Sequence, residues 1–308
     1  MSDFTQRIIA DINKTGFALE LRVAQHLRNR DYHVATNIYF VDRDEEKGRE
    51  VDIRALKNSF FEAEGIRRAV RHCLLIECKK SVKRPWIFFT SAAVSYDQSL
   101  RGVLSRGVSD TWIGTREESI KLREQHPWFR EPDRGRSFYE GFSNDADANS
   151  SIQKAVLGAI KATIETHESD FAAGFSNLSN ATFYYPIVVF QGELLRAYLS
   201  GSELVVTPVD HVLVSVHYRS TRYPSDDKHT VLVAREAAFP VAIEQLDDWL
   251  EICTEKFKIQ PDCFMPVAGE PRMVAKKIES ARATQQPAKH RSRKRRNRWA
   301  DSPEAADR

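Results

Sequence analysis

The sequence predicts an α/β sandwich in which helices flank a central mixed β-sheet. Apolar residues recur at helical spacing in separate segments, and alternating or continuous apolar runs lie between those segments. The resulting order is helix, strands, helix, strands, helix, which is typical of helices packed on a mixed sheet. A chain of 308 residues with 42% hydrophobic residues can bury a substantial core, so a disordered or fibrous protein is excluded.

Two helices are predicted at the start of the chain. The apolar residues of 4–12 recur at helical spacing, and Thr15–Gly16 provides a cap for a second helix from Phe17 to about Arg30. We expect the inward face of the second helix to carry Phe17, Leu21, Ala24 and Leu27 or Arg28. Glu20 falls on the same face, where a carboxylate is costly unless it is paired or binds a cation.

Strands are predicted next. Residues 34–41 are β-rich, residues 43–48 form a polar turn, and residues 50–56 alternate with period two. Residues 72–80 open with a continuous apolar run, which is typical of a strand buried on both faces, and residues 86–89 form another short apolar strand.

Residues 97–149 lack sustained periodicity, and we interpret them as an insertion or lid region. From Ser151 a serine-capped helix begins, which we interpret as a core helix lying on the sheet. Strands are then predicted over residues 184–190, 204–207, 211–217 and 230–233, and a helix over 241–257. These elements predict one folded body over residues 1–270 and a tail over 271–308.

The net charge of +3 is unevenly distributed. From Lys276 onward there are 11 Lys/Arg against 4 Asp/Glu, so the body is mildly acidic and the tail is basic. Such a tail binds polyanions without sequence preference and with steep salt dependence. A solubilising disordered terminus and a nuclear-localisation-like address are the alternatives. The predicted nucleic-acid contacts of the tail are Arg291, Arg293, Lys294, Arg295, Arg296 and Arg298.

The four cysteines form no CxxC pair, which predicts free thiols in a reducing compartment. The sequence shows neither an apolar signal core at its start nor eighteen consecutive apolar residues. We therefore expect a cytoplasmic protein without a membrane partner, with association to the nucleoid as an alternative.

Familiar phosphate-loop, dinucleotide, zincin and hydrolase motifs are missing, but a set of carboxylates and a lysine remains. In the strand over 50–56, Asp52 is predicted to face away from Val51 and Ile53. In the strand over 72–80, Glu77 and Lys79 share a face. If the two strands pair, Asp52, Glu77 and Lys79 converge, and two adjacent carboxylates repel unless a cation joins them. Hard oxygen ligands of this kind favour Mg²⁺ or Mn²⁺.

The Glu-x-Lys triplet alone has little specificity, because residues 45–47 have the same form in a polar turn. Glu77 and Lys79 instead end a buried apolar strand, where charges are normally avoided. The alternative interpretation is a strand-end salt bridge between Glu77 and Lys79 or Arg54. Lys83 and Arg84, next to Trp86, are predicted phosphate or base contacts, with Trp86 in the core as the alternative.

This layout resembles the PD-(D/E)XK nuclease superfamily, whose members have a restriction-endonuclease-like α/β/α sandwich. The resemblance covers residues 16–90 and extends to the helix at 151–167 and the strand at 186–190. Val51 stands where the family often has proline. The glutamate on the preceding helix, Glu20, is similar to that of Mrr-like and Holliday-junction-resolvase-like branches.

The resemblance implies a metal-dependent endonuclease. Asp52, Glu77 and the backbone carbonyl of Cys78 would hold Mg²⁺ or Mn²⁺, Lys79 would orient or deprotonate the attacking water, and Glu20 would complete the site. DNA is expected in preference to RNA, in defence, restriction or repair, and cleavage of a duplex implies a homodimer. The alternative is a catalytically idle nucleic-acid-binding or scaffold protein on the same fold.

Overall fold

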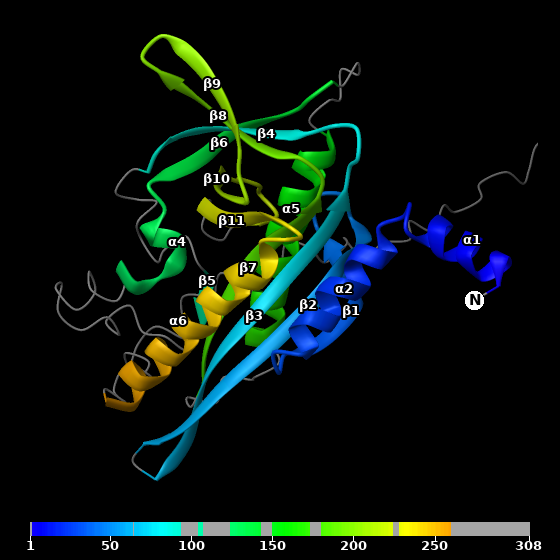
Figure 1. Cartoon of the computed structure of the whole chain (residues 1–308). Coiled ribbons are helices and arrows are strands. Elements are labelled where there is room, and N and C mark those ends of the chain that lie inside the picture. The colour runs from blue at the N-terminus through cyan, green and yellow to red at the C-terminus, as the bar shows by residue number, and fades with distance from the viewer. Residues whose placement is uncertain are drawn as a thin grey trace, which may run out of the picture. The chain divides into compact units, whose positions relative to one another are not determined.

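A mixed β-sheet of eleven strands runs through the described part of the chain, with helices packed on both of its faces (Figure 1). The computed structural model describes residues 2–63, 65–93, 104–106, 124–142, 150–172, 180–223 and 228–259. The predicted architecture of a mixed sheet flanked by helices is confirmed at this level. The basic tail and its six predicted contacts lie outside the described residues.

The element bounds follow the predicted order with several additions. The helices are α1 (Asp3–Ile12), α2 (Phe17–Arg28), α4 (Pro127–Arg130), α5 (Ser150–Ala172) and α6 (Phe239–Ile259). The strands are β1 (His33–Asp42), β2 (Lys47–Ala63), β3 (Ile66–Lys80), β4 (Trp86–Ala92), β5 (Leu104–Arg106), β6 (Asp133–Glu140), β7 (Asn180–Gln191), β8 (Leu194–Ser200), β9 (Glu203–Pro208), β10 (His211–His217) and β11 (Lys228–Arg235).

The strand order is β1-β2-β3-β7-β11-β10-β6-β4-β8-β9, and β5 pairs with β7 outside this path. The strands β1, β2 and β3 form an antiparallel meander. β3 then pairs in parallel with β7, and β7 in parallel with β11. The segment that carries the predicted catalytic residues is therefore anchored to a strand more than one hundred residues later in the sequence.

Two apolar layers sandwich the sheet. On one face, α2 and α6 pack on alternate residues of β3 and β7, such as Ile76 and Ile187. On the other face, α5 packs on the intervening residues, such as Val188 and Phe190. The prediction of a core helix after residue 150 is confirmed, since its apolar face is fully buried.

The hairpin of β2 and β3 is much longer than the sequence predicted. Pairing runs from Ile53–Ile76 out to Ala63–Ile66, through residues that lie between the strands predicted over 50–56 and 72–80. The error arises because this arm carries mixed side chains, with Phe61 buried and Phe60 exposed against Arg67.

Residues 124–142 of the predicted insertion or lid region are integrated into the sheet and the core. There β6 pairs with both β4 and β10, and Trp128 and Phe129 of α4 lie in the main core. The short β5 also joins the sheet, and the rest of this region lies outside the described residues. The aromatic residues that lacked periodicity in sequence are therefore partly core residues.

The buried face of α2 differs from the predicted one. It carries Leu19, Val23, Ala24 and Leu27, whereas Phe17 and Leu21 are exposed. Glu20 still lies beside this face, because it precedes Val23, Ala24 and Leu27 by three, four and seven residues.

Cys73, Cys78 and Cys253 are free and buried, as predicted. Within the described residues, no helix has the length and apolar character needed to span a membrane.

Candidate active site

The ladder between β2 and β3 opens at Asp52. In the register of this hairpin Asp52 comes opposite Glu77, but pairing stops one residue earlier, at Ile53–Ile76. On the other side, Asn37 of β1 also lacks a paired partner at this level and has a positive φ of 56°. The backbone of β2 therefore changes direction at Asp52.

This change of direction corrects the predicted alternation. Ile53 and Ala55 lie in the core under α2 and α6, but Val51 packs on the opposite face with Cys73 and Leu75. The assumption of a regular strand failed because Asp52 interrupts the pleat. On β3 the alternation holds, and Ile76 and Cys78 share the face opposite Glu77.

The predicted carboxylates and lysine meet where the ladder opens. The backbone N–H of Cys78 donates a 2.6 Å hydrogen bond to Oδ2 of Asp52. Nζ of Lys79 donates to Oε2 of Glu77 at 2.8 Å and lies 3.7 Å from Oδ2 of Asp52. Beyond this point β3 remains paired with β7 as far as Lys80–Gln191, which holds the backbone of all three β3 residues.

Burial and the neighbouring charges together set the pKa values of Glu77 and Lys79. Burial raises the pKa of Glu77 to about 7, and repulsion from Asp52 adds to this rise while Lys79 opposes it. Burial acts against the charged form of Lys79, but attraction to Glu77 and Asp52 outweighs it and raises the pKa of the ammonium. With protein groups alone, Lys79 is a charged donor that bridges two acids.

The ion pair of the alternative interpretation is thus present between Glu77 and Lys79. Arg54 takes no part in it, because its guanidinium pairs with Asp170 of α5 at 3.2 Å. The structure therefore separates the two candidate cations and leaves Lys79 as the one that contacts both acids.

Glu20 contributes its charge from α2. Burial raises the pKa of Glu20, and Asp52 and Glu50 raise it further, while Lys79 lowers it. Glu50 was missed by the sequence argument. Glu50 lies two residues before Asp52, and this spacing could have placed both acids on one face of a regular strand. Nothing in the strand pattern connected Glu50 with Glu20, which lies on a helix.

Gly158 of α5 was also missed. A Cβ atom at this position would lie 3.2 Å from Oε1 of Glu77, tighter than ordinary contact, so the absence of a side chain leaves room for the glutamate. The sequence could not reveal this contact, because Gly158 and Glu77 meet only through the packing of α5 on the sheet.

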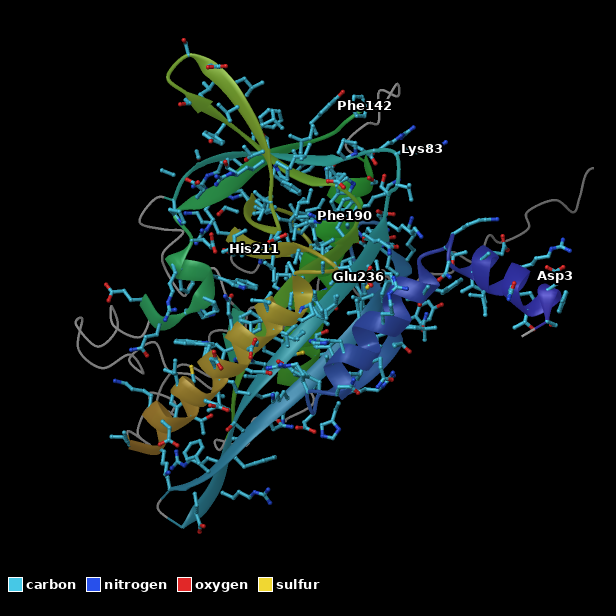
Figure 2. The ribbon with its side chains drawn as sticks, viewed as in Figure 1. Asp3, Lys83, Phe142, Phe190, His211 and Glu236 are labelled. Carbon is cyan, nitrogen blue, oxygen red and sulfur yellow. The ribbon has the colours of Figure 1, made fainter. Side chains whose placement is uncertain are left out.

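The predicted nucleic-acid contacts of the body follow β3 directly. Lys83 is exposed and points away from the fold in the turn between β3 and β4, as Figure 2 shows. The backbone of Arg84 is fixed by Ser81, whose hydroxyl accepts from the Arg84 N–H at 3.2 Å. Trp86 is a core residue that stacks on Phe190 with ring centroids 4.1 Å apart, so the core interpretation of Trp86 is confirmed.

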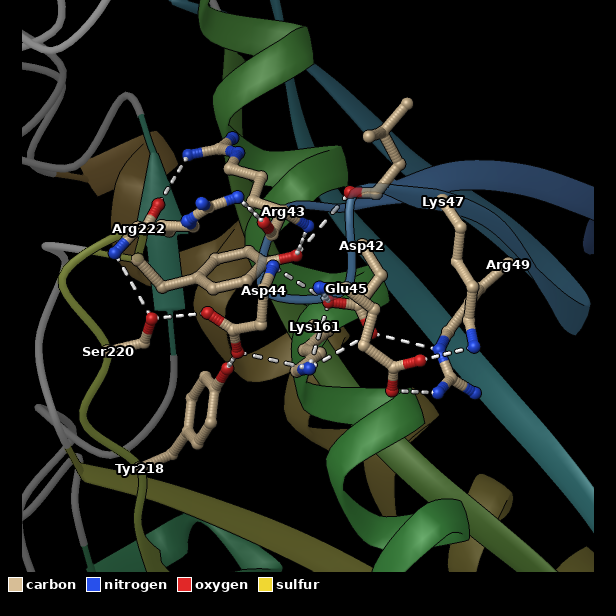
Figure 3. Close-up of polar contacts among 12 residues, drawn as sticks. Asp42, Arg43, Asp44, Glu45, Lys47, Arg49, Lys161, Tyr218, Ser220 and Arg222 are labelled. Atoms are coloured by element: carbon tan, nitrogen blue, oxygen red, sulfur yellow. Dashed lines mark hydrogen bonds and ion pairs between the residues drawn. The ribbon is translucent and has the colours of Figure 1, made fainter. Parts of the chain in front are cut away.

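A second polar cluster joins the β1–β2 turn to α5 and to the segment after β10 (Figure 3). Nζ of Lys161 lies 2.9 Å from the buried carboxylate of Asp42 and 3.1 Å from that of Asp44. Arg49 pairs with Asp42 at 2.9 Å and also acts through its charge to lower the pKa of Glu77. Tyr218 and Ser220 donate to Asp44 from the other side. This cluster, formed mainly by Asp42, Asp44, Arg49 and Lys161, fixes the β1–β2 turn and the start of β2, which begins five residues before Asp52.

The donor set fits a magnesium-like cation in number and chemistry. Within the described ranges, no three His, Cys, Asp or Glu side chains form a ready cluster for a metal. Mg²⁺ is usually bound through one or two carboxylates, several waters and substrate phosphates. Asp52 and Glu77 supply two adjacent carboxylates whose mutual repulsion a divalent cation would relieve.

Searches of protein-family models, curated proteins and solved structures found no match to this chain.

Proposed function

We propose that the protein is a Mg²⁺- or Mn²⁺-dependent nuclease that hydrolyses phosphodiester bonds, of DNA in preference to RNA. The observation that carries the proposal is the meeting of Asp52, Glu77 and Lys79 where the β2–β3 ladder opens. The same arrangement supports the restriction-endonuclease-like assignment of the fold. A structural salt bridge would need only one acid, whereas here two acids share one lysine.

Asp52, Glu77 and the carbonyl of Cys78 would hold the cation, with Glu20 close enough to interact through its charge. A bound divalent cation lowers the pKa of water and neutralises charge on the phosphate. The N–H of Cys78 orients the carboxylate of Asp52, and Glu77 orients the ammonium of Lys79. Nζ of Lys79 lies beside both carboxylates, where it can orient or deprotonate the attacking water.

The body has no excess of positive charge, so attraction to the substrate backbone is assigned to Lys83, Arg84 and the basic tail. These groups bind phosphate without reading bases. These contacts therefore give the proposed enzyme little sequence preference.

The test is incubation of the full chain with supercoiled plasmid, single-stranded DNA and RNA, in Mg²⁺ or in EDTA. We expect cleavage only with the metal, and loss of cleavage in Asp52→Ala, Glu77→Ala and Lys79→Ala. Lys80→Ala is the matched control, since Lys80 donates to the carbonyl of Asn13 and leaves the carboxylates untouched.

Undiminished cutting by any of the three variants would contradict the assignment. Metal-independent binding of nucleic acid without cleavage by the wild type would favour the catalytically idle alternative.

A further inference from the structure

The helix α1 presents an apolar stripe that nothing in the described part of the chain covers. Phe4, Ile8 and Ile12 follow one another at intervals of four residues, and each is between 42% and 70% exposed. None of the residues of α1 is buried. A shallow groove of about 500 Å³ is lined entirely by residues of α1 and by Lys14.

A helix of this kind requires a partner surface. Isolated helices shorter than about 12–15 residues are marginal in water, and most helices in proteins are stabilised by packing of an apolar face. α1 has 10 residues, and its end is tied to the fold through the bond from Lys80 to the carbonyl of Asn13. Among the described residues nothing packs on the stripe, so a partner surface is needed to account for its amphipathic pattern.

The charges beside the stripe indicate what that molecule is. Arg7 and Asp11, four residues apart, lie on one flank of the apolar stripe, where the exposed carboxylate of Asp11 also pairs with Lys14 of its own chain at 3.3 Å. When two identical helices pack antiparallel, the same flanks meet. With Ile9 at the two-fold axis, residues whose numbers sum to 18 come level, so Arg7 of each chain comes level with Asp11 of the partner subunit.

The same register also interleaves the apolar side chains. The partner subunit's Ile8 comes level with position 10, and the partner subunit's Ile12 with position 6. Along the helix axis, Ile8 of each chain therefore lies between the partner subunit's Ile8 and the partner subunit's Ile12, so the apolar side chains interdigitate. A parallel arrangement in register would instead place Arg7, Asp11 and Asp3 level with their own copies.

We propose that α1 is a dimerisation helix that packs antiparallel on α1 of a second copy of this chain, through Ile8 and Ile12, with reciprocal Arg7–Asp11 ion pairs. A membrane surface fits the helix less well. Helices that bind membrane interfaces carry many Lys and Arg on their polar face, whereas α1 balances Arg7 against Asp3 and Asp11. The inference does not rest on the proposed function, because it depends only on the surface of α1.

A charge-swap experiment on the full chain tests the proposal, with sedimentation velocity and no nucleic acid present. We expect the wild type to dimerise, and Arg7→Glu and Asp11→Lys each to weaken dimerisation by about tenfold or more, because like charges then meet twice. The double variant Arg7→Glu/Asp11→Lys restores the pairs and the dimer. A mixture of the two single variants forms heterodimers, because each supplies the charge that the other lacks.

Ile8→Asp should also abolish association, by placing a charge in the apolar seam. Leu199→Asp is the control, because Leu199 is also an exposed apolar residue, on β8, remote in sequence from α1. All of the substituted side chains are exposed, and unchanged thermal melting confirms that each variant folds.

A wild type that stays monomeric throughout a concentration series would overturn the proposal, as would a dimer that tolerates all of the α1 substitutions. Cosedimentation of the wild type with anionic phosphatidylserine vesicles, abolished in Ile8→Asp, would assign α1 to a membrane surface instead. Cleavage is not measured in these experiments, so their failure is independent of the nuclease assay.

Discussion

The carboxylate of Asp52 occupies the place where the β2 backbone would otherwise bond to β3, and it accepts a 2.6 Å hydrogen bond from the N–H of Cys78. The two strands separate at this point, yet their side chains stay linked. Where the strands separate, Asp52 of β2 and Glu77 of β3 both lie within ion-pair distance of Lys79. The candidate site therefore arises from a local interruption of the sheet, and its geometry depends on what surrounds that interruption.

Gly158→Ala should impair cleavage while preserving the fold. A Cβ there would lie 3.2 Å from Oε1 of Glu77, so the glutamate must shift by a few tenths of an ångström, and the rate should fall by less than the roughly hundredfold that a misplacement of about 1 Å can cost. Alanine is at the same time the better helix former, so thermal melting should not fall. The matched control is Gly48→Ala, since a Cβ at Gly48 meets no atom within 4 Å. Equal cleavage rates for the two variants would contradict the contact.

Glu77 should link stability to pH and to metal. Its folded pKa of about 7 exceeds the ordinary value of 4.5, so between these values the folded chain holds a proton that the unfolded chain releases. Without metal, the free energy of unfolding should thus fall as the pH rises through this window, by up to about 3 kcal/mol. Thermal melting in EDTA at pH 5 and pH 8 measures this, and Glu77→Gln should flatten the dependence.

Added Mg²⁺ at pH 8 should then raise the melting temperature of the wild type, because it stabilises the ionised form of Glu77. The same rise in Glu77→Gln would show that the cation binds elsewhere.

Lys161→Met should destabilise the fold strongly. Its ammonium is the buried partner of Asp42, and removing one partner of a buried ion pair typically costs about 3–5 kcal/mol. Urea unfolding measures the loss. Lys154→Met, on the exposed side of the same helix, is the control and should change stability by less than about 0.5 kcal/mol. A similar stability for both variants would mean that the cluster of Asp42, Asp44, Arg49 and Lys161 contributes nothing to folding.

Deletion of residues 274–308 should weaken binding of nucleic acid at low salt. For every phosphate that the shortened chain no longer neutralises, the slope of log affinity against log salt becomes shallower by about 0.9 on duplex DNA. Fluorescence anisotropy across a salt series measures this slope, while metal-dependent cleavage of a short duplex at saturating concentration should survive the deletion. An unchanged slope would assign the tail to another role.

The parts of the fold that could be predicted from sequence are those in which local periodicity decides the structure. The helix after residue 150 is predictable because its apolar residues repeat at helical spacing, and Glu77 and Lys79 can be placed on one face because β3 is regular. β8 was missed because its side chains are only partly buried and do not alternate cleanly.

The remaining features depend on tertiary contacts that no local pattern encodes. The interruption of pairing at Asp52 coincides with the positive φ of Asn37 on a neighbouring strand, and the space for Glu77 is provided by a glycine eighty-one positions away. The buried face of α2 could not be predicted from apolar character alone, since Phe17 and Leu21 are apolar but exposed.

The parallel pairing of β3 with β7 also determines when the site can form during synthesis. The meander of β1, β2 and β3 leaves the ribosome long before β7, so β3 first exists as an open edge. Pairing between segments so distant in sequence is slow and exposes the chain to aggregation until it is complete. A nascent chain shorter than about residue 191 therefore has Asp52, Glu77 and Lys79 but lacks the strand that holds them in place. The three side chains are consequently held in place only late in translation, after the neighbouring strand has emerged.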